Sequence, residues 1–396
     1  MNGQTLNKLN LFLGGLVLFS ILLFPDFVVK SSLPRIQFID FLLPVIMLVI
    51  FLQRKLLIVS LLYKILAVFF GWILLTIMIN GRIDQLRDYF ELYKILKFGC
   101  IIGLFSLLNF EDVFHKILKP VFLLLVVVNL LHYFNVFNFN YLIKEYYNGG
   151  IHIDTFGLNS IGEPDIKRMI GFAGNPNVNA VIFSLFSLIF LVRSRDEKRS
   201  IWLFSIATFM LFLCQSRTNF LAFVVVFLSY LLVSRPFIKH DFKLISAVFF
   251  TFFLSFIVSS NSYMLSLINP TVVQTNSVMG RLEVWQLLGE MIIQKPIFGH
   301  GPNKDFFYDR NLYPESEYVL QTWRYGIVGV GVFLAMLFSP LYHSKNVNLK
   351  MLFALALAVI LINSLTNNPF TDRQINVFFA ALIGVFIGSK KMINYA

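Results

Sequence analysis

The stretch IWLFSIATFMLFLCQSRTNFLAFVVVFLSYLLV, residues 201–233, decides how this chain folds. It is apolar except for its centre, Gln215-Ser-Arg-Thr-Asn219. As one helix, rising about 1.5 Å per residue, it would be roughly 50 Å long, which is too long for the ~30 Å hydrocarbon core of a bilayer. Both flanks, 193–199 and 234–240, are basic, so both are expected on the cytoplasmic side. The stretch therefore predicts a hairpin of two short spans with Arg217 at its outer tip.

The rest of the chain has the same character. Of its 396 residues, 57% are hydrophobic and only 14% are charged, and its mean hydropathy is +0.75. A soluble domain carries about 25% charged residues, so lipid is the expected solvent here. We predict an all-α, polytopic membrane protein, a single domain over 1–396, with about twelve spans. They are expected near 11–29, 36–52, 56–79, 89–108, 117–137, 174–192, 201–215, 218–233, 244–261, 322–342, 351–364 and 375–389.

The distribution of positive charge sets the expected orientation. With both termini in the cytoplasm, 16 Lys and Arg side chains fall in cytoplasmic segments and 7 in short outer segments. This is the bias that the positive-inside rule describes. The net charge of +12 is thus explained by topology, and nucleic acid is not expected as a partner. The two long loops, about 138–173 and 262–321, are expected outside, where a membrane enzyme can hold a polar site.

Arg217 is the first candidate for such a site. An arginine at that depth costs roughly 2.5–3.5 kcal/mol on insertion scales unless it faces water or a partner. A snorkelling or carboxylate-paired arginine is the simpler interpretation. We prefer an anion site that opens outward.

Arg281 is the second candidate. Residues 281–294 have apolar side chains at 282, 285, 288 and 292, which predicts an amphipathic helix ending at Lys295-Pro296. Start signals at 276–280 place Arg281 in its first turn, where the helix dipole repels a cation. A bound phosphate would remove that conflict. A solvent-facing arginine, or one paired with Glu283, is the alternative.

The other candidates flank these two. Glu315, Glu317 and Arg324 lie just before or at the start of the next span, and a carboxylate near the membrane face can serve as a base. They could equally be solvated loop residues. An Asn-Pro turn in 171–180 includes Asn175 and Asn177, which suit helix capping as well as substrate contact. His300 lies in a glycine turn, and the sequence has no metal motif, so we expect no metal and no cofactor.

Four stretches resemble the O-antigen polymerase and O-antigen ligase superfamily of bacterial polysaccharide assembly. They are Gly174-Asn-Pro-Asn177, Ser216-Arg-Thr-Asn219, Gly280-Arg-Leu-Glu-Val-Trp285 with Pro296-Ile-Phe-Gly-His-Gly301, and Glu317-Tyr-Val-Leu-Gln-Thr-Trp-Arg-Tyr-Gly-Ile-Val-Gly329. The likeness covers roughly residues 170–330. It implies a metal-independent, inverting glycosyltransferase of the GT-C kind in the bacterial inner membrane. The implied donor is an oligosaccharide on undecaprenyl diphosphate.

The resemblance also implies roles. Arg217 and Arg281 match the family's arginines proposed to hold the diphosphate, and two guanidinium forks suit a dianionic leaving group. Arg324, Glu315, His300, Asn175 and Asn177 are candidate substrate contacts. Ligases place a histidine, usually followed by asparagine, where this chain has Glu317-Tyr318. We therefore expect a Wzy-type polymerase of O-antigen, capsule or exopolysaccharide repeat units, with Glu317 as the candidate base.

Other readings stay open. His300, Glu315 or no protein group could act as the base in place of Glu317. The enzyme could be a ligase that transfers finished glycan to lipid A core or another acceptor. A transporter or flippase of lipid-linked oligosaccharide also has about twelve spans, but it usually shows related halves, which this sequence lacks. The expected partners are the lipid-linked oligosaccharide and membrane lipid, with a chain-length regulator protein as a candidate.

Overall fold

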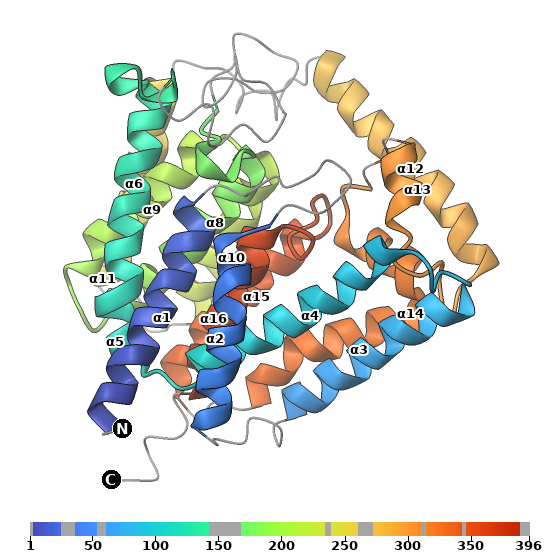
Figure 1. The fold of residues 1–396 in the computed structure, drawn as a ribbon. Helices are drawn as coiled ribbons and strands as arrows, with labels where there is room; N and C mark the ends of the chain where they lie inside the picture. Colours follow the sequence, from blue (N-terminus) through green and yellow to red (C-terminus); the bar gives the residue numbers. More distant parts are fainter. Residues whose placement is uncertain are drawn as a thin grey trace.

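A computed structural model describes residues 3–24, 36–53, 61–141, 168–233, 239–259, 272–310, 312, 314–342 and 346–388. Most of the first predicted outer loop, 138–173, lies outside these residues, as does the start of the second, 262–321. The described residues form an all-helical protein (Figure 1).

Each of the twelve predicted spans corresponds to a helix. They are α1 (Gly3–Leu23), α2 (Phe38–Leu52), α3 (Leu61–Ile79), α4 (Leu86–Phe105), α6 (Lys119–Phe134), α8 (Pro176–Arg193), α9 (Ser200–Leu213), α10 (Arg217–Val233), α11 (Lys239–Ser259), α14 (Glu317–Phe338), α15 (Val347–Asn363) and α16 (Arg373–Gly388). Within the described part, six helical stretches are long and apolar enough to cross a membrane, and five shorter helices are apolar. The chain is therefore a polytopic membrane protein. Of the twelve helices, α4 belongs to neither group, because charged side chains interrupt its apolar sequence.

Predicted boundaries shift where helices extend beyond their apolar runs. The first helix begins at Gly3 rather than near 11, because the polar residues before the apolar run are helical too. Before α6, the short helix α5 (Phe110–Val113) and the π-helical turn η2 (Phe114–Leu118) continue directly into it. Helix α14 begins at Glu317 rather than near 322.

Helix α8 lies at the centre of the bundle, since its side chains from Asn179 to Val192 are all buried. It packs against α9, α15, α16 and α10. Helix α16 also packs against α4, and this contact needs glycine. A Cβ at Gly384 would lie 2.6 Å from the carbonyl oxygen of Ile102, and one at Gly388 would lie 2.5 Å from that of Ser106. Helices α3, α4 and α14 run side by side next to this bundle (Figure 1).

The predicted hairpin at 201–233 is confirmed. Helix α9 ends at Leu213, Gln215 adopts a left-handed conformation (φ 48°), and α10 begins at Arg217. The two helices touch through phenylalanines, among them Phe212 and Phe220 with ring centroids 5.5 Å apart. Arg217 is thus at the tip of the hairpin, as the length of the stretch required.

The predicted start of the helix carrying Arg281 is wrong. Helix α12 spans Val272–Gln294, so Arg281 is well inside it and not in its first turn. The start signals at Asn276, Ser277 and Gly280 are overridden, and the conflict with the helix dipole disappears. The predicted end before Lys295-Pro296 is confirmed.

Helix α14 is unwound at Gly326, which has φ 65° and ψ −174°. The break leaves backbone N–H and C=O groups without helical hydrogen bonds, and away from water these groups need other hydrogen-bond partners. The carbonyls of Trp323 and Arg324 accept from the N–H groups of His300 (2.9 Å) and Gly301 (2.8 Å). The indole of Trp72 donates to the Tyr325 carbonyl (2.9 Å).

The loop that contains His300 and Gly301 also supplies an acceptor, since the Ile327 N–H donates to the Pro296 carbonyl (2.9 Å). Residues 296–301 thus replace the missing helical hydrogen bonds of α14. This fixes the glycine turn around His300 against the unwound turn of the helix.

Candidate functional site

The tip of the α9–α10 hairpin is joined to the start of α8. The Ser216 hydroxyl donates to the Asn177 side-chain oxygen (2.8 Å), and the Asn219 amide donates to the Asn177 carbonyl (3.1 Å). Asn175 caps α8 by accepting from the Asn177 N–H (2.8 Å). Of the two predicted residues, Asn175 therefore caps the helix and Asn177 holds the hairpin tip in place.

A short loop after α15, residues 364–370, joins this tip to the start of α14. The Thr366 hydroxyl donates to the hydroxyl of Thr218, which directly follows Arg217 (2.9 Å). The Glu317 N–H donates to the carbonyls of Ser364 (2.9 Å) and Asn367 (3.1 Å). The loop thus brings Arg217, which is half-buried, into the same neighbourhood as Glu317.

The carboxylate of Glu317 is fully buried and hydrogen-bonded at both oxygens. One oxygen accepts from the Gln321 amide (2.7 Å) and the other from the Phe370 N–H (3.0 Å). These contacts fix the start of α14 under the 364–370 loop. They also mean that the carboxylate has no exposed surface in this conformation.

Arg281 and Glu315 form an ion pair through the arginine Nε. The indole of Trp285, one turn further along α12, donates to the Pro314 carbonyl. Both contacts hold α12 to the segment just before Glu317. Arg281 is therefore paired with a carboxylate, as its alternative interpretation expected, but with Glu315 and not with Glu283.

His300 and Arg324 lie in a second group beside α4. The imidazole of His300 stacks on Trp323, with ring centroids 5.0 Å apart, and its Nε2 lies 2.9 Å from the Met291 carbonyl oxygen. Burial lowers the pKa of His300 below its ordinary value, and the nearby Lys295 lowers it further, against the effect of the Met291 hydrogen bond. Arg324 is buried and lies 3.6 Å from Glu91.

Two parts of this region were missed by sequence reasoning. Thr366 and its loop carry no charge and match no motif, so nothing in the sequence marks them. The charged residues of α4 did leave a signal, because ionisable side chains inside a span are costly and rare. They are Asp88, Glu91, Lys94 and Lys97, which recur every three residues along the helix.

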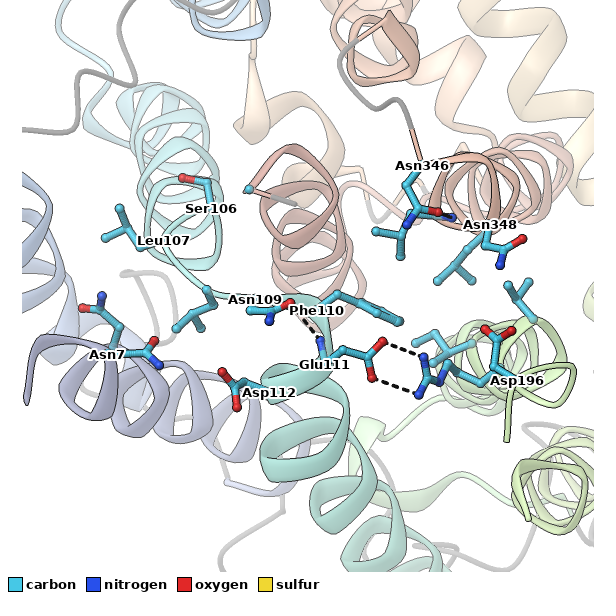
Figure 2. Close-up of a pocket in the computed structure, with 18 of the residues that line it drawn as sticks. Asn7, Ser106, Leu107, Asn109, Phe110, Glu111, Asp112, Asp196, Asn346 and Asn348 are labelled. Atoms are coloured by element: carbon cyan, nitrogen blue, oxygen red, sulfur yellow. Dashed lines mark hydrogen bonds and ion pairs between the residues drawn. The ribbon is translucent and has the colours of Figure 1, made fainter. Parts of the chain in front are cut away.

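A cavity of about 720 Å³ lies at the end of the bundle where α8 ends. Figure 2 shows the side chains that line it. It is lined by the first turns of α1 and α15 and by the last turns of α8 and α16. The predicted residues Asn175 and Asn177 instead lie at the start of α8, and Glu317 contacts the loop after the end of α15. In its wall, the Arg193 guanidinium donates two hydrogen bonds to the Glu111 carboxylate (2.7 and 2.9 Å). The cavity is thus separate from the candidate site.

Residues 202–325 match the family described as O-antigen ligase. No curated protein matches the chain. The matched segment runs from α9 to the unwound turn of α14, so it includes Arg217, Arg281, Glu315, Glu317 and Arg324. This match supports the resemblance of residues 202–325 to the O-antigen ligase and polymerase superfamily.

Proposed function

We propose that this protein is a polymerase that joins lipid-diphosphate-linked oligosaccharide repeat units at the outer face of a bacterial inner membrane. The observation that carries the proposal is the continuous set of contacts that links Arg217, Glu317 and Arg281. It runs from Thr218 to Thr366, from the 364–370 loop to Glu317, and from Glu315 to Arg281. These contacts support placing the three residues, from three separate helices and all within the family-matched segment, in one site.

The two arginines are proposed to hold the donor's diphosphate. Guanidinium groups stay charged and offer paired donors to phosphate oxygens. Arg281 would exchange the Glu315 carboxylate for the diphosphate, and because that pair is partly exposed, the exchange costs little. Arg217 lies at the first turn of α10, where free N–H groups also favour an anion.

In the proposed reaction an acceptor sugar hydroxyl attacks the anomeric carbon of the donor. The new glycosidic bond forms as the bond from that carbon to the diphosphate oxygen breaks, and the configuration inverts. The hydroxyl proton passes to a base, and the diphosphate leaves with its electron pair. The arginines stabilise the negative charge that develops on the leaving group.

Glu317 is the proposed base. Its burial would make a carboxylate more basic than in water, which suits proton abstraction near neutral pH. To act, it would have to exchange one of its two hydrogen bonds, that of Gln321 or of Phe370, for the acceptor hydroxyl. Glu315 and His300 are the alternative bases. His300 is supported by its neutral imidazole and Glu315 by its place beside Arg281.

A ligase is the second candidate function, and the family match favours it equally. The feature that favours polymerisation is Glu317-Tyr318 at the position where ligases have a histidine. Transport remains the candidate from another class. The proposed outward orientation, with both termini cytoplasmic, rests on the excess of Lys and Arg in the opposite loops.

Gel analysis of surface polysaccharide from a deletion strain separates these functions. A polymerase defect leaves single repeat units on the surface. A ligase defect leaves long polymer on its lipid carrier, and a transport defect leaves no outward-facing material. Long, unattached polymer or a complete lack of surface units would contradict our proposal.

A further inference from the structure

A partly buried cluster of charge beside α14 contains more cations than anions. A single carboxylate oxygen of Glu91 lies 3.0 Å from the Lys94 ammonium, 3.0 Å from that of Lys304 and 3.6 Å from the Arg324 guanidinium. These four side chains come from α4, from α13 (Lys304–Asp309) and from α14. We call them the Glu91 cluster.

The surroundings do not balance this excess. Next to the cluster, Arg82 and Arg87 pair with Asp88 and Asp305, so two cations meet two carboxylates. One turn deeper along α4, Lys97 pairs with Asp40 (2.9 Å).

Glu317, two turns before Arg324 on α14, is within electrostatic reach of Arg324 and Lys94. Even when its carboxylate is counted, positive charge remains in excess. Uncompensated charge that is mostly shielded from water is unfavourable, so a further anion would stabilise the cluster.

The cluster has a donor ready for that anion. Among the described residues, the Nε of Arg324 is buried and has no hydrogen-bond partner. Arg324 is held in place because its carbonyl accepts from Gly301 and its guanidinium lies over the Phe307 ring. Lys94 and Lys304 keep 24% and 14% of their side-chain surface exposed, so an incoming group can reach them.

We propose that the Glu91 cluster is a second anion site, which binds a diphosphate group apart from the Arg217 and Arg281 site. A diphosphate ester matches the excess in charge and offers several oxygens to three converging donors. The assignment of the occupant rests on the proposed function. A polymerase must hold two lipid-linked glycans at once, so the occupant is the diphosphate of the second one. Glu91 then orders the three cations and weakens their hold on the ligand.

The test uses the full-length protein in detergent, with inorganic diphosphate as the probe and calorimetry as the readout. All variants are made in an Arg217→Ala, Arg281→Ala background, so that binding at the proposed donor site is removed. The key variants are Lys304→Gln and Glu91→Gln. Lys295→Gln is the matched control, because Lys295 lies in the same loop region but bonds the neutral Asn80 (2.7 Å).

We expect the background protein to bind diphosphate, Lys304→Gln to weaken binding at least tenfold, and Lys295→Gln to change it less than twofold. Glu91→Gln should bind more tightly. If it is less stable alone, diphosphate should restore its melting temperature. Absence of diphosphate binding in the background protein, or equal losses of affinity in Lys304→Gln and Lys295→Gln, would overturn the second site. Neither result would contradict the proposed donor site at Arg217 and Arg281.

A separate arm identifies the source of the anion. The protein is placed in phosphatidylcholine nanodiscs with or without phosphatidylglycerol, and diphosphate binding is measured again. We expect no change. Displacement of diphosphate by phosphatidylglycerol would make a phospholipid headgroup the occupant and overturn the assignment, as would equally tight binding of glucuronate, a carboxylate monoanion.

Discussion

The hydroxyl of Thr366 donates to the hydroxyl of Thr218 across 2.9 Å, and this bond joins the loop over Glu317 to the helix that begins with Arg217. If this hydrogen bond positions Arg217 and Glu317 for catalysis, Thr366→Val should lower turnover more than it lowers stability. A neutral hydrogen bond contributes about 0.5–1.5 kcal/mol, so the fold should survive. Transfer assays and thermal melts would measure the two effects, and Thr366→Ser should restore turnover. Equal turnover in the Val and Ser variants would argue against this role.

The proposed base can be tested by removing its charge alone. Glu317→Gln keeps the shape and an acceptor oxygen for Gln321 or Phe370 but cannot take a proton. General base catalysis typically contributes 10²- to 10⁴-fold, so we expect turnover to fall in that range while the protein remains folded. Glu315→Gln and His300→Gln serve as the comparison. Retained turnover in Glu317→Gln would make Glu317 an anchor for α14 and not the base.

The ion pair of Arg281 with Glu315 should compete with the donor. Glu315→Gln frees Arg281, so the KM for donor should fall, by no more than about fivefold because exposed pairs contribute only about 0.2–1 kcal/mol. Glu283→Gln, an exposed change on the same helix, should leave KM unchanged. A KM that rises in Glu315→Gln would instead indicate that Glu315 contacts substrate directly.

The unwound turn of α14 should require glycine. A Cβ at Gly326 would overlap the carbonyl of Ile297, and its φ of 65° disfavours any other residue. We expect Gly326→Ala to destabilise the protein by about 3 kcal/mol or more, since strain and overlap add. Gly331→Ala, later in the same helix with nothing within 4 Å, should be neutral or stabilising. Melting temperatures in detergent that agree for the two variants would contradict this account.

His300 should make stability depend on pH. Because burial lowers its pKa from 6.5, the unfolded chain binds more protons than the folded chain at mildly acid pH. Its contribution is complete above about pH 6.5 and is lost as pH falls further, through the lowered pKa. His300→Gln should flatten the fall in melting temperature between about pH 7 and 5. An unchanged slope would show that other groups cause it.

The hairpin illustrates what could be predicted from sequence. The length of residues 201–233 and their basic flanks permit one solution, so the place of Arg217 followed from geometry alone. The start of α12 did not follow, because Asn276, Ser277 and Gly280 are common helix-start residues and the helix nevertheless begins at Val272. Capping signals are weak beside the hydrogen bonds that extend a helix.

The individual residues of the candidate site were predicted from the sequence, but the contacts that connect them were not. The link from Thr218 to Thr366 joins positions 148 apart through two ordinary hydroxyls, which no pattern marks. The α4 part of the Glu91 cluster could have been found, since Glu91 and Lys94 stood inside a predicted span. What sequence could not supply was the third cation, because Lys304 reaches the cluster only through the fold.

Elongation of outward-facing, lipid-linked repeat units by purified protein in vesicles tests the central claim most directly. The wild type should convert single units into a ladder of longer glycans. Arg217→Ala should leave the units single, Arg217→Lys should be strongly impaired because the paired donors are lost, and Arg193→Ala, at the opposite end of the bundle, should act like the wild type. A full ladder from Arg217→Ala, or none from the wild type, would contradict the account.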